Sequence, residues 1–439
     1  MTPAGLTRDE VSALLEARLG RQPQDGLEAA VVLEAWGGVT AERAFEVAES
    51  ESAATLRGGP RNRPRRERLE ARESPTAELV PLLLAILAIA AWTGPLTSEL
   101  GVETVERALL VALPAALAAQ WFLRGRHFAG PRGLGSLSED AGPLATGLVV
   151  LSCLPVLGVP DVWWLGGLLV AAWVAGTVLS RAGLGLVYAG LVTLASLALA
   201  GGLPAAWVLA PTDLVLVGLL VLAVNAAPAS REGALSSRRA IAGLLLGAGI
   251  GGTLVLDPSI GWGIQGAAPA LALLPATVGT FWAGRHLSRV GIVIPAALDG
   301  APLGQSDRGS LASPALLLFF EALARMAAAT MVLSAALVTG QAWFGWPTVA
   351  PALFWAFAFL SLFAFLVGLL DTFGARAAAL GAVVVALVLE IGMAQLHAPA
   401  FPGEAALLAG LAGCVPAGAP LVYMLSRPGR MLATVLWIR

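Results

Sequence analysis

Three charged residues lie inside long apolar stretches, where an ionisable side chain is unfavourable unless it has a structural or functional role. Glu321 and Arg325 fall four residues apart in one apolar run, so a helix would present both on one face and allow them to pair. Glu390 falls in a second run, which we expect to start from the same side of a membrane. A charge inside a membrane costs about 3 kcal/mol or more unless it is paired or hydrated. These three residues are therefore the first candidates for a functional site.

Three interpretations of this trio stay open. In the first, Glu321 and Arg325 form a static ion pair that fixes helix packing, and Glu390 is a second partner for the arginine. In the second, the trio lines a central cavity on a substrate pathway, where Arg325 meets an anionic group such as a phosphate. In the third, Glu321 or Glu390 takes part in proton coupling.

Uncharged polar residues in the apolar runs are weaker candidates for the same pathway. They are Gln120, Asn225 and Gln395. An amide side chain in a membrane helix more often forms a hydrogen bond between helices than a ligand contact, so we expect a packing role for each.

The chain lacks the local motifs of several enzyme classes. It has no Walker A loop, no HExxH zinc spacing and no GxSxG elbow, so neither a metal nor another cofactor is expected. A membrane-embedded glycosyl or acyl transferase remains an alternative, with Glu99 or Glu103 in an outer loop as base or metal ligand. A non-catalytic scaffold subunit is a further alternative. Cys153 and Cys414 lie in apolar runs and are expected to be packed thiols.

The composition determines the fold class. Hydrophobic residues make up 57% of the 439 residues and charged residues only 13%, about half the share in soluble proteins. Most of the apolar segments reach the roughly 20 residues that cross a hydrocarbon core about 30 Å thick. We expect an all-α polytopic membrane bundle of about twelve transmembrane helices in two six-helix halves. The expected spans are 77–95, 104–123, 142–159, 162–180, 183–201, 211–227, 240–256, 264–284, 314–339, 347–370, 376–396 and 405–425.

The arginines predict the orientation. With twelve spans and a cytoplasmic N-terminus, nearly every arginine near a span falls in a cytoplasmic loop, and only Arg107 lies on the outer side. Both chain ends are then cytoplasmic. The absence of lysine and the abundance of Ala, Gly, Leu and Arg are typical of a GC-rich bacterial genome, so the expected location is a bacterial cytoplasmic (inner) membrane.

The polar N-terminal part predicts a separate cytoplasmic region. Helices are expected from a Thr7 cap to Leu19, over Gly26–Trp36 and over Thr40–Glu49. The expected division is 1–51 as this small helical region, 52–76 as a juxtamembrane linker, 77–426 as the transmembrane domain and 427–439 as a cytoplasmic tail. Residues 1–50 are a candidate docking region for polysaccharide-synthesis proteins.

The linker is rich in arginine, and we expect it to contact anionic lipid headgroups, where each basic residue contributes about 1 kcal/mol. No aromatic residues are interleaved with these arginines, so a nucleic-acid partner is not expected. The arginines assigned to the membrane surface are Arg61, Arg63, Arg65, Arg66 and Arg68.

One stretch resembles a known family. A span ending Phe365-Leu366-Val367-Gly368-Leu369-Leu370 is followed by the turn Asp371-Thr372-Phe373-Gly374-Ala375-Arg376 and by a long apolar span that contains Glu390. This arrangement resembles the C-terminal half of the multidrug/oligosaccharidyl-lipid/polysaccharide flippase superfamily. That family has twelve to fourteen spans in two bundles that give alternating access to a central cavity.

The resemblance covers about a sixth of the chain. The sequence departs from the family by its polar N-terminal region and by lacking a cationic cluster in the first bundle, which leaves the substrate open. The major-facilitator family fits the span count too, but the loop from Arg124 to Asp140 lacks its acidic-basic signature. The leading hypothesis is a secondary transporter or flippase for a lipid-linked or polymeric saccharide, with Arg325 in the cavity.

Overall fold

The computed structural model describes residues 8–19, 26–37, 39, 43–44, 46–48, 75–128, 134–227, 237–262, 267–298, 312–344 and 349–425. Helices dominate this part of the chain, and it contains no strand. The chain divides into two compact units. The first contains Met1–Arg72, Ala283–Ala324 and Ala419–Arg439; the second contains Glu73–Trp282 and Arg325–Gly418. The arginines of the linker, Arg61 to Arg68, lie outside the described residues.

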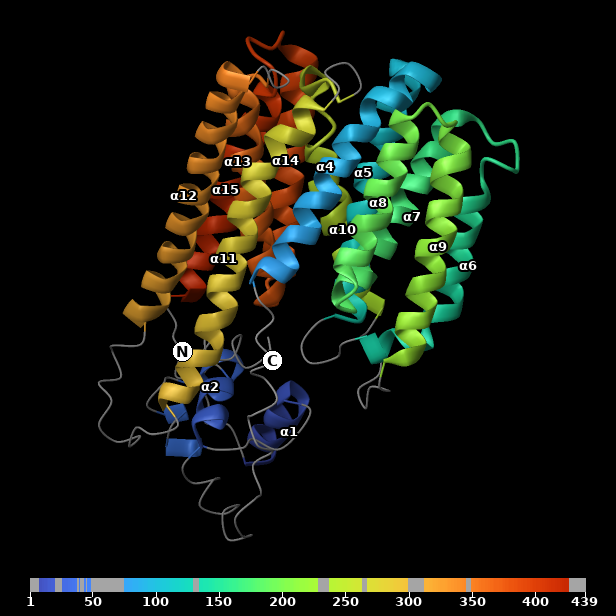
Figure 1. The fold of residues 1–439 in the computed structure, drawn as a ribbon. Helices are drawn as coiled ribbons and strands as arrows, with labels where there is room; N and C mark the ends of the chain where they lie inside the picture. Colours follow the sequence, from blue (N-terminus) through green and yellow to red (C-terminus); the bar gives the residue numbers. More distant parts are fainter. Residues whose placement is uncertain are drawn as a thin grey trace. The chain divides into compact units, whose positions relative to one another are not determined.

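Each expected apolar segment overlaps one helix, and these helices can be followed from blue to red in Figure 1. Among the described residues, seven helices are long and apolar enough to cross a membrane: α5, α7, α9, α12, α13, α14 and α15. The helices are α4 (Pro75–Leu100), α5 (Val102–Arg126), α6 (Ala141–Cys153), α7 (Asp161–Arg181), α8 (Gly185–Ala200), α9 (Ala205–Ala226), α10 (Ser237–Thr253), α11 (Ala268–Leu298), α12 (Ala312–Phe344), α13 (Pro351–Thr372), α14 (Arg376–Leu396) and α15 (Glu404–Leu425).

The largest differences from the expected bounds occur at three boundaries. The third span was expected to reach residue 159, but α6 ends at Cys153, two residues before Pro155, which cannot donate a helix hydrogen bond. The sixth was expected to begin at 211, but α9 begins at Ala205 and includes Pro211. The eighth was expected to end at 284, but α11 continues as one helix to Leu298. The helix thus extends through a stretch that the sequence analysis placed in a loop.

In the first unit, α1 (Arg8–Leu19) packs against α2 (Gly26–Trp36), close to the helix bounds expected from the sequence. Their apolar faces share a small core with Ala44 and Ala48, which belong to the helical residues 43–44 and 46–48. Val11 and Leu15 in α1 lie four residues apart, and Ala29 in α2 lies three and four residues before Val32 and Leu33, so local helical periodicity accounts for this packing.

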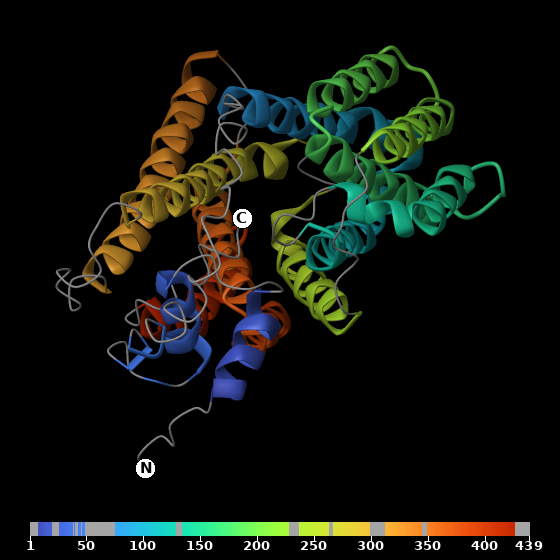
Figure 2. The same ribbon diagram turned by 90° about the horizontal axis from the view of Figure 1, so that it is seen from below.

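In the second unit, the helices α4–α9 share one large apolar core, and Figure 2 shows them gathered together when seen from below. Buried residues of α7 run through the middle of this core, including Leu165, Leu168 and Leu179. A separate core joins α11, α13 and α15, with Phe357 of α13 fully buried in it. The polar groups discussed below lie near the second core.

Helix α10 packs against α5 and α14 through glycines on two of its faces. A Cβ atom on Gly243, Gly247 or Gly251 would come within 2.5 Å of backbone atoms of α5. A Cβ atom on Gly249 would lie 2.1 Å from Cγ1 of Val383 in α14. The small-xxx-small spacing of Gly247 and Gly251 therefore brings two backbones into contact, as the sequence indicates, and Gly243 extends it by one turn.

Candidate functional site

A cluster of carboxyl groups gathers where α10 ends and α15 begins. Asp257 follows α10 in the chain and caps a short 3-10 helix over Pro258–Ile260. One of its carboxylate oxygens, Oδ1, accepts hydrogen bonds from the backbone N–H of Ser259 at 2.9 Å and from the Ser259 hydroxyl at 2.5 Å. These short-range contacts hold the Asp257 side chain in one orientation.

The same two residues also hold the start of α15. The second carboxylate oxygen of Asp257 accepts a hydrogen bond of 3.1 Å from the N–H of Ala406, and the Ser259 hydroxyl accepts one of 2.9 Å from the N–H of Gly403. The first N–H groups of a helix lack partners within it, and its N-terminus favours negative charge. Asp257 therefore caps α15 from a distant part of the chain.

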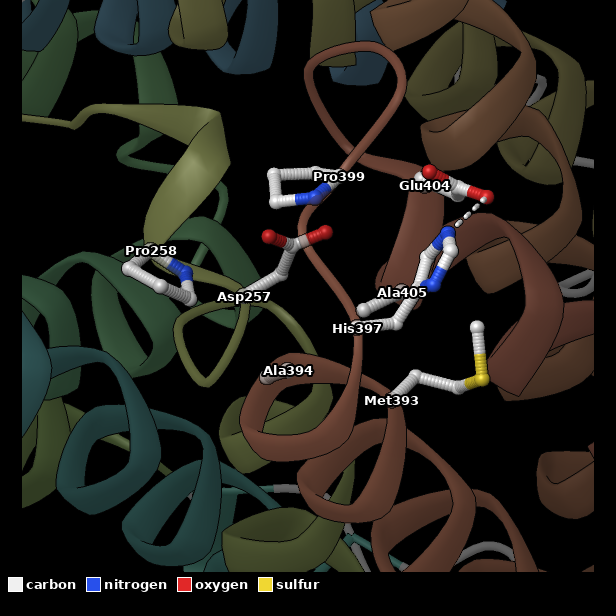
Figure 3. A pocket seen from close by; sticks show the side chains of 8 residues that line it. All are labelled: Asp257, Pro258, Met393, Ala394, His397, Pro399, Glu404 and Ala405. Atoms are coloured by element: carbon white, nitrogen blue, oxygen red, sulfur yellow. Dashed lines mark ion pairs between the residues drawn. The ribbon is translucent and has the colours of Figure 1, made fainter.

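Next to this cap is a small pocket of about 20 Å³, room for about one water molecule. Figure 3 shows the His397 ring directed toward Glu404, and the two groups are 4.0 Å apart. This pocket is too small for a sugar or a lipid headgroup. Its lining comes from the segment after α10, from the end of α14 and from α15: Asp257, Pro258, Met393, Ala394, His397, Pro399, Glu404 and Ala405.

Glu390 lies one helical turn before Met393 and Ala394 on α14 and is fully buried. Neither of its carboxyl oxygens has a hydrogen-bond partner among the described residues. The backbone amide of Asp257 approaches this carboxyl without forming a hydrogen bond, and Asp257 also acts on it electrostatically. The structure thus brings Glu390 to another acid and does not bring it into a hydrogen bond with Arg325.

Arg325 is exposed on α12, within the predominantly apolar run from Leu316 to Trp343. It is not sealed in dry packing. Glu321 lies on the same helix, in the first unit, where its carboxylate is 3.4 Å from Nε2 of His286 on α11. His286 is a neighbour of Glu321 that the sequence did not indicate, since it lies on another helix.

The weaker pathway candidates divide into two groups. Gln120 accepts a hydrogen bond of 2.9 Å from the indole N–H of Trp173, which joins α5 to α7 and gives it the packing role expected. Asn225 and Gln395 are exposed near the ends of α9 and α14. None of the three lines the pocket beside Asp257.

The acids considered as bases of a transferase are engaged in other contacts. Both carboxylate oxygens of Glu99 accept from the N–H of Ala205, at 2.8 and 3.1 Å, so Glu99 caps α9 as Asp257 caps α15. Glu103 pairs with Arg107 at 2.5 Å on one exposed helix face. No group of three or more metal-binding side chains occurs among the residues that the structure describes.

Every histidine of the chain lies at ion-pair distance from an acid. Besides the two pairs above, Nε2 of His127 is 3.1 Å from Oδ2 of Asp140, and Arg126 donates to the same oxygen at 2.5 Å. The hydrogen bond from Arg126 holds the pKa of Asp140 below its usual value. Burial lowers the pKa of His127. The sequence alone did not indicate these pairs, because none of the three acids lies on the same helix as its histidine.

The sequence analysis also missed Asp213, a buried acid two turns inside α9, whose Oδ2 has no hydrogen-bond partner among the described residues. It was overlooked because the span was expected to begin at Pro211, which placed Asp213 at a helix end. Tyr188 of α8 lies close enough to Asp213 for an electrostatic interaction between the two side chains. The Tyr188 ring also lies against Gly176 of α7, where a Cβ atom would be 2.5 Å from the ring.

Cys153 and Cys414 are free thiols, as expected. Comparison with protein-family models, with curated proteins and with solved structures finds no match for this chain. The fold defines an all-α protein whose seven long apolar helices are consistent with a multi-pass membrane protein.

Proposed function

We propose that this chain is a secondary transporter or flippase of about twelve spans that moves a lipid-linked or polymeric saccharide across a bacterial cytoplasmic membrane by alternating access. Both chain ends are cytoplasmic in this proposal, and residues 1–50 offer a docking region for proteins of polysaccharide synthesis. The two apolar cores of the second unit, one in α4–α9 and one in α11, α13 and α15, support a layout in two halves.

One observation carries the proposal: Arg325 is exposed on α12, a predominantly apolar helix whose other charged residue is Glu321. Arg325 lies about 14 Å along the run that starts at Leu316, at a rise of about 1.5 Å per residue. An arginine facing lipid there would cost about 3 kcal/mol, whereas one facing a hydrated cavity or an anion would not. The diphosphate of a lipid-linked saccharide is an anion that a guanidinium binds in bidentate geometry.

Transport in proteoliposomes tests this role. The probe is a fluorescent polyprenyl-diphosphate disaccharide, and its movement between leaflets is followed by quenching from outside. Arg325→Ala should slow movement at least about tenfold, because a charge-assisted hydrogen bond of about 1.5–3 kcal/mol is lost, and Arg325→Lys should recover part of the rate. Arg107→Ala removes another exposed arginine and should have no effect. An Arg325→Ala rate equal to that of the unaltered protein would refute the proposal.

The proposed orientation has its own test. A single cysteine replaces Gly37 or Ala400 in a protein from which Cys153 and Cys414 have been removed. In intact spheroplasts an impermeant thiol reagent should label the cysteine at 400 and leave the one at 37 unlabelled until the membrane is opened. The reverse pattern would invert the orientation.

A further inference from the structure

We propose that Glu390 is the proton-binding site of this transporter, and that gain or loss of its proton controls how Asp257 holds the start of α15. This inference rests on the proposed function, because it names the ion that drives transport. It is carried by the fully buried carboxyl of Glu390, which has no hydrogen-bond partner among the described residues, interacts with Asp257, and lies one helical turn from two residues that line a water-sized pocket.

The packing of α10 on α14 brings the two acids together. Gly249 and Gly252 of α10 contact Val383 and Leu387 of α14. One turn beyond Leu387 on that face, the next side chain is Glu390. One turn beyond Gly252, the chain leaves α10 and reaches Asp257. The close approach of the helices thus places Glu390 beside the cap of α15.

The hydrogen bonds assign different roles to the two acids. Asp257 accepts three hydrogen bonds, from the N–H and hydroxyl of Ser259 and from the N–H of Ala406, so its negative charge is well compensated. The fully buried carboxyl of Glu390 has no such partner among the described residues. Two neighbouring buried carboxylates repel, and the less compensated one binds the proton. Glu390 is that group.

The other charged groups on the helices around Glu390 are few. His397 and Glu404 lie at the pocket, at the end of α14 and the start of α15. The charged residues of α10 and α13 and the arginine of α14 lie at the far ends of those helices: Arg238, Arg239, Asp371 and Arg376. The remaining titratable residues of α15 are Cys414 and Tyr423, at least two turns beyond Glu404.

The pocket provides the route for the proton. Met393 and Ala394, which line it, follow Glu390 by three and four residues and so lie above it on the same face of α14. A water molecule there could pass a proton to the carboxylate, forming an O–H bond on Glu390 and releasing the proton again by the same path. When Glu390 is ionised, its repulsion of Asp257 weakens the hydrogen bond to Ala406.

Infrared difference spectroscopy of the full chain in lipid nanodiscs tests the site without any substrate. Between about pH 5 and about pH 9, a carbonyl-stretch band of a buried carboxylic acid should appear on acidification and shift when glutamate is labelled with carbon-13. Glu390→Gln should remove it, Glu390→Asp should replace it with an unlabelled band, and Glu404→Gln should leave it unchanged. A band that survives Glu390→Gln, or the absence of a titrating band, would overturn the inference.

A second measurement tests the link to α15. In the cysteine-free protein, Ala405→Cys places a thiol in the pocket and Ala400→Cys places one at an exposed position nearby. The labelling rate at 405 divided by that at 400 should rise severalfold from low to high pH, and Glu390→Gln should abolish this rise. A ratio that does not change with pH would refute the coupling.

These results separate the inference from the proposed function. A titrating Glu390 band in a protein that moves no saccharide would leave the proton site intact and remove the saccharide proposal. Movement of the saccharide that depends on Arg325, with no Glu390 band, would leave the transporter and remove the proton site.

Discussion

The carboxylate of Asp257 caps a helix whose first residue lies almost 150 positions later in the sequence, through its 3.1 Å hydrogen bond from the N–H of Ala406. Glu99 does the same for α9 through Ala205. The N-termini of α9 and α15 are therefore each stabilised by a carboxylate from another segment. The packing of these two helices depends in part on those single side chains.

Removing the cap of α15 should destabilise the protein measurably. Asp257→Ala leaves the N–H of Ala406 without its acceptor and should cost about 1–2 kcal/mol, as for other N-cap losses. Asp257→Asn retains an amide oxygen as acceptor and should cost less. Thermal unfolding of the detergent-solubilised protein measures both. Equal stability of Asp257→Ala and the unaltered protein would show that the cap is unimportant.

The contact of α10 with α5 should not accommodate a side chain at Gly247. Gly247→Ala places a Cβ atom where only 2.2 Å separates it from the carbonyl oxygen of Leu117, and both groups belong to helix backbones that must move apart. We expect a loss of about 1–3 kcal/mol, as for other overpacked sites. Gly381→Ala is the matched control, because its Cβ atom would meet nothing within 4 Å on α14. That substitution should be neutral or slightly stabilising.

The pair Gln120 and Trp173 should behave as a structural hydrogen bond. A double-mutant cycle of Gln120→Leu and Trp173→Phe, read from thermal unfolding, should give a coupling energy of about 0.6 kcal/mol, the usual value inside membranes. Saccharide movement should survive Gln120→Leu in proportion to the folded protein. A loss of movement with full stability would instead place Gln120 on the substrate pathway.

The buried acid Asp213 should cost stability. Asp213→Leu removes a carboxyl whose Oδ2 has no hydrogen-bond partner among the described residues. Because an unsatisfied buried polar atom costs about 1–3 kcal/mol, the unfolding temperature of this variant should rise or stay unchanged, and that of Asp213→Asn should stay close to the original. A large drop for Asp213→Leu with none for Asp213→Asn would reveal a polar partner in the membrane.

Stability should fall on acidification because of His127 and Asp140. Burial lowers the pKa of His127, so below its ordinary value of 6.5 the unfolded chain binds a proton before the native state does. The stability held by the neutral histidine is therefore present above pH 6.5 and is lost as the pH falls toward the native pKa. Asp140, whose pKa Arg126 lowers, adds a loss in the same direction at more acidic pH.

Thermal unfolding in detergent at a series of pH values measures this effect. His127→Gln should flatten the curve just below pH 6.5 and leave the more acidic loss, whereas Asp140→Asn should reduce the acidic loss. His397→Gln, which replaces a more exposed histidine, serves as the control. A curve that is unchanged in His127→Gln would contradict the assignment.

The sequence alone determined the all-helical fold and the position of its helices, because apolar runs of about 20 residues and helical periodicity are local properties. It also identified Glu390 as a candidate functional residue. It did not identify Asp213, because the sixth span was expected to begin at residue 211, whereas α9 begins at Ala205.

Only the tertiary structure decided which side chains meet. That Glu390 lies beside Asp257, that Glu321 lies beside His286, and that Asp257 holds α15 all depend on contacts between segments distant in sequence. Burial of a charge and the number of its hydrogen bonds are set by every helix around it. The helical periodicity of a sequence does not determine this burial or these hydrogen bonds, since it indicates which residues share a face of one helix and not which residues of other helices cover that face.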